Sequence, residues 1–327
     1  MDARDVVDAV VEFPVVTSFT RLGYDVRSRV DHWTPTSRYD LRGRVMLITG
    51  STSGIGLAAA TALASDGATV VLLGRNPEKT ARVADELRAQ SGNDTVGSVV
   101  ADMSDLGAVR AVAAEVLERY DRLDVLVHNA AVLSATRRNA PDGTEETVAC
   151  QVVAPFLLTS LLLERLRASP VARVLTMASG GMYTVPLDVA HLEMSESDYK
   201  GAEQYARAKR AQVTLNELWA ARTDGTGVVF QSLHPGWVDT PGLEEALPKF
   251  RRVVGPLLRS PQQGADTLVW LAADDGPPLT TNGRFWLDRR PRALHKIGRT
   301  RRSDTPAERE RLWAWCTDRA RIDPFAA

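Results

Sequence analysis

Short apolar runs alternate with longer helical patterns over most of the chain, from residue 44 to about residue 288. Unbroken apolar runs are typical of strands that are buried on both faces, as in a parallel sheet covered by helices. Right-handed crossovers between such strands give a doubly wound sheet. The pattern therefore predicts an α/β fold with a doubly wound parallel sheet of about seven strands. The expected strands span residues 44–49, 68–73, 97–101, 123–128, 173–177, 228–233 and 283–287.

Helical patterns fill the intervals between these strands, which places helices on both faces of the sheet. The longest expected helix spans Glu145–Ala168, and Pro155 predicts an irregularity within it because proline removes a hydrogen-bond donor. Another expected helix, Gln204–Thr223, carries the residues of most chemical interest. The remaining expected helices span residues 56–66, 76–90, 106–120 and 262–273.

The two ends of the chain differ from this central region, residues 44–288. Residues 1–43 form an N-terminal extension, and residues 289–327 form a polar, arginine-rich tail with an expected helix at Pro306–Arg319. Within the extension, apolar residues recur at helical spacing and predict an amphipathic helix. That helix could pack against the body or a partner chain, or lie on a membrane surface, and the short apolar stripe favours packing. The apolar positions are Val15, Phe19, Leu22, Val26 and Val30.

Composition narrows the possible functions only slightly. The chain has 327 residues and a net charge of −1, which argues against broad attraction to nucleic acid. Cys150 and Cys316 have no metal-binding spacing, so we expect no metal site and free thiols, with one long-range disulfide as the alternative. The first eight residues are acidic rather than apolar, and no apolar run is long enough to span a membrane. We therefore expect a cytoplasmic protein.

A glycine-rich turn, TGSTSGIG at Thr49–Gly56, follows the first expected strand and opens the first expected helix. Glycine lets the backbone turn tightly and approach a phosphate, and a helix N-terminus supplies N–H groups and a positive dipole. Its position between strand and helix is the context that supports a dinucleotide site. The expected cofactor contacts here are Gly50, Ser51, Ser53, Gly54, Ile55 and Gly56.

Residues after the second and third strands predict which dinucleotide binds. Dinucleotide sites for NAD(H) usually place an acidic side chain after the second strand, whereas arginine suits the 2′-phosphate of NADP(H). Arg75, followed by Asn76, therefore favours NADP(H) over NAD(H), although a solvated arginine is the alternative. Asp102, followed by Met103, could accept a hydrogen bond from the adenine amino group. Capping the next helix is its alternative role, for which Ser104 or Asp105 is better placed.

Tyr205 and Lys209 lie four residues apart in one expected helix, so their side chains share a face. A fixed cation beside a phenol stabilises the phenolate, and we expect Lys209 to lower the pKa of Tyr205. Such a phenol can exchange a proton near neutral pH. Together with the glycine-rich turn, the pair predicts a hydride-transfer enzyme.

These motifs resemble those of the short-chain dehydrogenase/reductase family over about residues 44–288. TGSTSGIG matches its cofactor motif, YARAK its YxxxK motif, and HPGWVDT its PGxxxT segment. The match is closer to the retinol-dehydrogenase-like branch, through ASGGMY, QGADTLVWL and GRFWLDRRP. The resemblance implies a Rossmann-like fold, an oxidoreductase activity, and homo-oligomers formed through the long helices.

The resemblance also implies roles for individual residues. Ser179 would hold the substrate carbonyl oxygen, Tyr205 would be the general acid or base, and Lys209 would bind the nicotinamide ribose. Gln151 occupies the place of the family's relay asparagine and is one methylene longer, which puts the relay geometry in doubt. Further cofactor contacts would come from Asn129, Ala130, Pro235, Gly236, Val238 and Thr240.

Two departures from the family pattern leave an alternative open. Besides Gln151, Ala131 replaces a glycine after the fourth strand, where His128 is expected to be structural. A non-catalytic NADP(H)-binding regulator is therefore the alternative to an enzyme. A nucleotide-sugar epimerase is disfavoured, because the glycine spacing differs from that class and only 118 residues follow Lys209.

Two segments bear on the substrate. Pro241–Pro261 is apolar and is expected to cover the site as a lid, which favours a lipophilic aldehyde, ketone or alcohol. Met182–Glu203 is longer than the corresponding segment of simpler family members. It either shapes the substrate pocket or is a solvated surface insertion.

Overall fold

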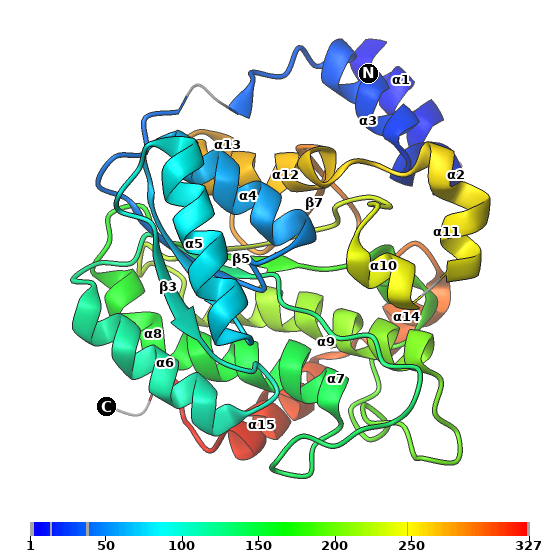
Figure 1. The fold of residues 1–327 in the computed structure, drawn as a ribbon. Coiled ribbons are helices and arrows are strands. Elements are labelled where there is room, and N and C mark those ends of the chain that lie inside the picture. The colour runs from blue at the N-terminus through cyan, green and yellow to red at the C-terminus, as the bar shows by residue number, and fades with distance from the viewer. Residues whose placement is uncertain (1–2, 14, 37–38, 247, 326–327) are drawn as a thin grey trace.

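An eight-stranded sheet forms the centre of the computed structural model, which describes residues 3–13, 15–36, 39–246 and 248–325 (Figure 1). The strand order is β3-β2-β1-β4-β5-β6-β7-β8, with parallel pairing from β3 to β7. This confirms the predicted doubly wound sheet. The strands are β1 Val45–Thr49, β2 Thr69–Gly74, β3 Gly97–Val100, β4 Val125–His128, β5 Arg173–Met177, β6 Val229–Leu233, β7 Arg284–Leu287 and β8 Arg290–Pro291.

Helices cover both faces of the sheet (Figure 1). Successive strand residues alternate between two apolar clusters, so Leu47 packs toward α8 and α9 while Ile48 packs toward α4 and α12. The helices of the body are α4 Gly54–Ser65, α5 Pro77–Ser91, α6 Leu106–Arg119, α7 Glu146–Val148, α8 Ala154–Arg167, α9 Gly201–Arg222, α10 Pro241–Ala246, α11 Pro248–Val254, α12 Pro261–Ala273, α13 Pro277–Thr280, α14 Gly298–Ser303 and α15 Pro306–Ala320.

The long helix before β5 contains the predicted irregularity. A π-helical turn, η2 (Ala149–Val153), lies between α7 and α8 directly before Pro155. The ring of a proline clashes with the carbonyl four residues earlier, and a π turn relieves that clash. By length and composition, Glu146–Arg167 could span a membrane, but 78% of its most apolar window is buried. It is a core helix of this fold.

The N-terminal extension contains three helices, α1 (Ala3–Glu12), α2 (Val15–Phe19) and α3 (Arg21–Val30). The prediction of one continuous helix after residue 14 is therefore wrong at Thr20, which is extended. Donors of the central region reach both carbonyls at the break, and the Thr20 carbonyl also accepts from the Tyr24 N–H at 3.4 Å. The Trp237 N–H donates to the Phe19 carbonyl at 2.6 Å, and Arg259 Nε donates to the Thr20 carbonyl at 3.2 Å.

The last strand was not predicted from the sequence. Asp288 and Arg289 form a two-residue turn, both with φ of 55°, and β8 then pairs antiparallel with β7. Turns of this kind usually contain glycine or asparagine, because other residues rarely adopt a positive φ. The residues of this turn therefore gave no sequence signal for it.

Candidate active site

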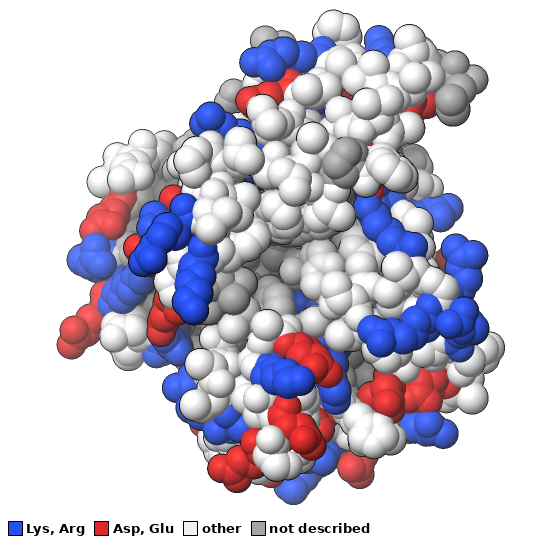
Figure 2. Space-filling model, turned by 90° about the vertical axis from the view of Figure 1, so that its right-hand side faces the viewer, with Lys and Arg blue, Asp and Glu red and all other residues white. Residues whose placement is uncertain are grey.

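The carboxyl ends of the parallel strands meet at one edge of the sheet, and every expected site segment follows one of them or lies beside them. Figure 2 looks onto this side of the molecule and shows a hollow near its centre, beneath the largely uncharged N-terminal helices. The topology thus brings together residues that are more than 100 positions apart in the sequence.

The glycine-rich turn is closely packed between β1 and β4. Gly50 has a φ of 65°, and a Cβ placed on it would lie 2.8 Å from the Ala130 Cα. A Cβ on Gly56 would lie 2.5 Å from both Asn129 Nδ2 and the Gly50 carbonyl oxygen. Only glycine fits at these positions, which leaves the first-turn N–H groups of α4 available to a ligand. The cradle therefore fits a dinucleotide pyrophosphate.

Polar side chains next to the glycine turn brace it. Asn129 Nδ2 donates to the carbonyls of Thr49 and Gly50 at 2.9 and 3.1 Å. Thr49 Oγ1 accepts from the backbone N–H groups of Asn129 and Ala130 at 2.9 and 3.0 Å. The buried Ser51 hydroxyl accepts from the Leu73 N–H at 3.1 Å. The expected contacts Asn129 and Ser51 thus have side chains that hold the loop rather than reach into the site.

The expected adenosine-side residues follow β2 and β3. Arg75 is exposed, and Asn76 Oδ1 caps α5 by accepting from the Lys79 N–H at 2.8 Å. Asp102 Oδ1 accepts from the N–H and hydroxyl of Ser104. The alternative role for Asp102 as a helix cap is wrong, because Asp105 caps α6. Met103, also expected here, is 4% exposed.

Tyr205 and Lys209 lie on one face of α9, as the four-residue spacing predicts. Lys209 is buried, and its Nζ donates to the Met177 carbonyl at 2.8 Å. The same nitrogen lies over the Tyr205 ring, 5.3 Å from its centroid. Ser179, directly after β5, forms a side-chain hydrogen bond with Tyr205. The three side chains thus converge at the carboxyl end of β5.

Burial controls the ionisation of this group. Burial raises the pKa of Tyr205 to about 12, against a smaller lowering by the hydrogen bond from Ser179. The expectation that Lys209 lowers the pKa of Tyr205 is therefore wrong for this geometry. Burial also lowers the pKa of Lys209 to about 7. Loss of hydration on burial disfavours the charged form of each group, the phenolate of Tyr205 and the ammonium of Lys209.

The segment after β6 closes the site opposite the glycine turn. A Cβ on Gly54 would lie 3.3 Å from Thr240 Cγ2, so these two loops face each other. Gly236 has a φ of 81°, and a Cβ there would lie 2.3 Å from Arg259 Nε. Val238 is buried and pairs with Arg259 in an isolated bridge. Arg259 therefore shapes the segment that contains Pro235, although no sequence motif singled it out.

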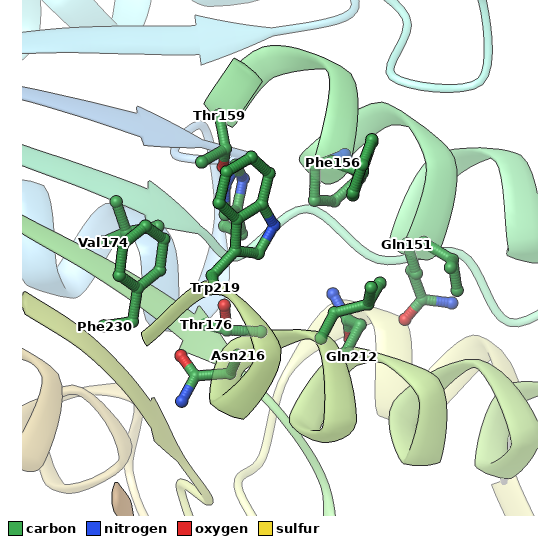
Figure 3. A pocket seen from close by; sticks show the side chains of 13 residues that line it. Gln151, Phe156, Thr159, Val174, Thr176, Gln212, Asn216, Trp219 and Phe230 are labelled. Atoms are coloured by element: carbon green, nitrogen blue, oxygen red, sulfur yellow. The ribbon is translucent and has the colours of Figure 1, made fainter. Parts of the chain in front are cut away.

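Gln151 lies on the π turn next to a small internal cavity of about 20 Å³ (Figure 3). Its Nε2 donates to the Val132 carbonyl at 3.0 Å, and among the described residues its Oε1 has no partner. Figure 3 shows that oxygen turned toward Gln212, which also lines the cavity. Such a volume can hold about one water molecule. Gln151, in the place of the family's relay asparagine, thus still offers a buried amide oxygen as a hydrogen-bond acceptor beside α9.

His128 lies at the other end of the same cavity. Its Nε2 forms a hydrogen bond with the Thr159 hydroxyl at 2.8 Å, and burial lowers its pKa to about 3. A neutral, fully enclosed imidazole fits the structural role expected for it. No group of three or more potential metal-binding side chains occurs among the described residues.

The two segments linked to the substrate differ in character. Met182–Glu203 is not a solvated insertion, because Leu187, Val189 and Met194 are buried. Its backbone N–H groups are bound by side chains of later helices, such as the Leu187 N–H by Ser303 Oγ at 2.9 Å. A larger hollow of about 580 Å³ borders this segment, and neither Ser179 nor Tyr205 lines it. In the lid, α11 contacts the site through Phe250, whose ring lies 5.0 Å from that of Trp237.

Comparison with known proteins agrees with this arrangement. A family model described as short chain dehydrogenase matches residues 44–249. The human protein Dehydrogenase/reductase SDR family member 12 is 35% identical over 294 residues, which cover 90% of this chain and 91% of that protein. Human retinol dehydrogenase 11 is 31% identical over 264 residues, covering 80% and 82%. A solved short chain dehydrogenase from Shigella flexneri, complexed with NADP, is 25% identical, with a TM-score of 0.60 and coverage of 77% of this chain and 100% of that one.

Proposed function

Because the chain belongs to the short-chain dehydrogenase family of oxidoreductases, we propose that it uses NADP(H) to interconvert a lipophilic aldehyde or ketone and its alcohol. The observation that carries this proposal is the convergence of Ser179, Tyr205 and Lys209 beside the glycine cradle. A site that positions two reactants and a proton donor together has the main requirements for hydride transfer.

In this proposal Tyr205 gives its phenolic proton to the substrate oxygen as the carbonyl carbon accepts hydride, which NADPH supplies when bound. The C=O bond becomes an alcohol C–O bond, and the phenol becomes a phenolate. A pKa of about 12 keeps the phenol protonated at neutral pH, which suits the reductive direction. The Ser179 hydroxyl donates to the substrate oxygen, and Lys209 would bind the ribose of the nicotinamide nucleotide. Oxidation of the alcohol reverses each step.

The cofactor preference rests on the end of β2. Arg75 is exposed there, where a 2′-phosphate would need a cation. The NADP bound by the Shigella relative supports the same choice. We propose that the chain prefers NADP(H) to NAD(H).

The substrate class rests on the lid. Phe250 of α11 packs on Trp237 in the segment after β6, with ring centroids 5.0 Å apart. A lipophilic carbonyl compound would gain more from such a cover than a charged one. The name of the human retinol dehydrogenase relative supports the same class.

The test is NADPH consumption against a panel of lipophilic aldehydes and ketones. We expect substrate-dependent turnover that falls by about 10²- to 10⁴-fold in Tyr205→Phe, with NADPH binding retained. Tyr120→Phe, at the end of α6, is the matched control and should turn over normally. Tight NADPH binding without any turnover would favour the non-catalytic regulator instead. Turnover of polar substrates alone would reject the proposed substrate class.

A further inference from the structure

Helix α1 turns its charged side toward the protein. Asp8 accepts from Arg27 Nε at 2.8 Å and from Arg292 Nη1 at 2.6 Å. Glu12 accepts from Arg27 Nη2 at 2.9 Å and also pairs with Lys296. These carboxylates lie on one side of the helix, and ion pairs rather than apolar contacts attach that side to the body.

The opposite side of α1 is apolar and faces solvent. Val10 is 69% exposed and Phe13 is 92% exposed, and no residue of α1 is buried. An amphipathic helix on a globular protein normally buries its apolar side, so α1 is inverted. Exposed apolar side chains also occur on α2 and α3, which pack beside α1. We call the set the N-terminal apolar surface: Val6, Val7, Val10, Phe13, Val15, Val16 and Leu22.

The inverted orientation is fixed by buried charge. Arg27 is 2% exposed and bonds to Asp8 and Glu12 of α1 as well as to Asp288 of the sheet edge at 2.6 Å. Rotating α1 to bury its valines would leave the Arg27 guanidinium and its partners incompletely paired, which is costly in the interior. The fold therefore holds the N-terminal apolar surface outward, and large apolar side chains exposed in this number on neighbouring helices indicate an interaction site.

We propose that the N-terminal apolar surface docks on an anionic membrane. Exposed basic side chains on the same helices and on the lid outnumber the exposed carboxylates described there, which are Asp5, Glu244 and Glu245. Asp8 and Glu12 are turned inward and paired. Apolar insertion combined with basic flanks is the composition that binds at a lipid surface. A second copy of the chain would bring the same basic rim against this one. The flanking cations are Arg4, Arg21, Arg29, Lys249 and Arg252.

The lid belongs to the same side of the molecule. Phe19 of α2 packs edge-on against Trp237 at 5.9 Å, and Trp237 packs in the same way against Phe250 of α11. Val253, also on α11, is 82% exposed. These ring contacts link α2 to α11, and Figure 2 shows a largely uncharged surface around the central hollow. If the proposed function holds, a lipophilic substrate could pass from the bilayer to the lid without crossing water.

The experiment is flotation of the full-length protein with phosphatidylcholine vesicles, prepared with and without phosphatidylserine. We expect binding to the vesicles that contain phosphatidylserine, weakened by added salt because the flanking charges are screened. A Val10→Asp, Phe13→Asp double variant should lose about tenfold or more in partitioning. Both positions are exposed, so this variant should keep its thermal stability. Phe325→Asp, at the opposite end of the fold, should bind like the original protein.

Three results would overturn the proposal. One is full-length protein that stays unbound with both kinds of vesicle, and another is equal binding by the double variant. The third is a dimer in sedimentation that the double variant disrupts while vesicles remain unbound, because the surface would then be an interface between copies. None of these measurements depends on turnover, so failure of the proposed enzyme function would be seen separately.

Discussion

Lys209 shows how a single residue can cost stability in order to serve a site. Its ammonium is buried, and a backbone carbonyl of Met177 is the hydrogen-bond partner that the structure assigns to it. A carbonyl dipole offsets only part of the lost hydration of a charge. Sites that carry such strain are commonly less stable than the same fold would be without them.

Replacing this lysine should therefore stabilise the fold. We expect Lys209→Met to unfold at a higher temperature than the original protein at about pH 6, with a smaller difference at about pH 9. The ordinary pKa of 10.5 applies in the unfolded chain and about 7 in the folded one. The unfolded chain thus binds more protons between these values, and the stability of the original protein rises with pH across that range.

Thermal unfolding of both proteins without added NADPH measures this difference. Lys79→Met, on the exposed side of α5, is the matched control and should show no such pH-dependent gain. A gain for Lys209→Met that is the same at both pH values would show that burial of the charge is not its cause.

In the proposed function, the choice between NADPH and NADH depends on Arg75. We expect Arg75→Ala to lower the ratio of kcat/KM for NADPH to that for NADH by about 10- to 100-fold, because a charge-assisted contact to the 2′-phosphate is lost. Arg82→Ala, on exposed α5, is the control and should leave the ratio unchanged. Steady-state kinetics with both cofactors measures the effect, and an unchanged ratio in Arg75→Ala would assign the preference to another residue.

At the scale of elements, α15 gives the C-terminal tail a structural role. Leu312 is fully buried, and the Trp313 ring lies 4.8 Å from that of Trp219 on α9 and 5.0 Å from that of Phe156 on α8. The tail helix was expected from the sequence, but its partners were not. It occupies part of the surface of the long helices through which homo-oligomers were expected, and oligomerisation stays a prediction.

The packing of α15 can be tested with one truncation. We expect Leu312→Ala to lower the free energy of unfolding by about 2–5 kcal/mol, through lost burial and the cavity that remains. Ala314→Ser, on the exposed side of the same helix, should change it by less than about 0.5 kcal/mol. Urea unfolding compares the two. Equal stabilities would mean that α15 separates from the body before the body unfolds.

At the scale of the whole molecule, Asp288 joins parts of the chain that are far apart in sequence. It accepts from Arg259 at 2.5 and 2.9 Å and from Arg27 at 2.6 Å, and all three side chains are 1% exposed. Arg259 in turn shapes the loop at Gly236, and Arg27 holds α1. The N-terminal helices and the cofactor side of the site are therefore tied to one carboxylate.

Neutralising that carboxylate should loosen the N-terminal helices. We expect Asp288→Asn to lose about 3–5 kcal/mol of stability, because two buried guanidinium groups lose their shared charge partner. Limited proteolysis should then cut within residues 13–40 sooner than in the original protein. Asp40→Asn removes an exposed ion pair with Arg42 and should leave the stability nearly unchanged. Unchanged proteolysis in Asp288→Asn would show that other contacts hold the extension.

The features that the sequence determined by itself depend on residues that are close together along the chain. The strand and helix alternation, the glycine turn at Gly50–Gly56 and the shared face of Tyr205 and Lys209 follow from local spacing. The proline-linked irregularity near Gln151 follows from the covalent structure of proline. These features could be predicted because backbone geometry fixes them within a few residues.

What only the tertiary structure decided depends on burial and on distant partners. The raised pKa of Tyr205 results from desolvation, which exists only once the fold excludes water. The carbonyl at the Thr20 break accepts from Arg259, and the carboxylate of Asp288, a turn residue with positive φ, accepts from Arg27, in each case across more than 200 residues. The apolar side of α1 faces outward for a similar reason. Ion pairs with Arg27 and Arg292 outweigh the tendency of an amphipathic helix to bury its apolar side.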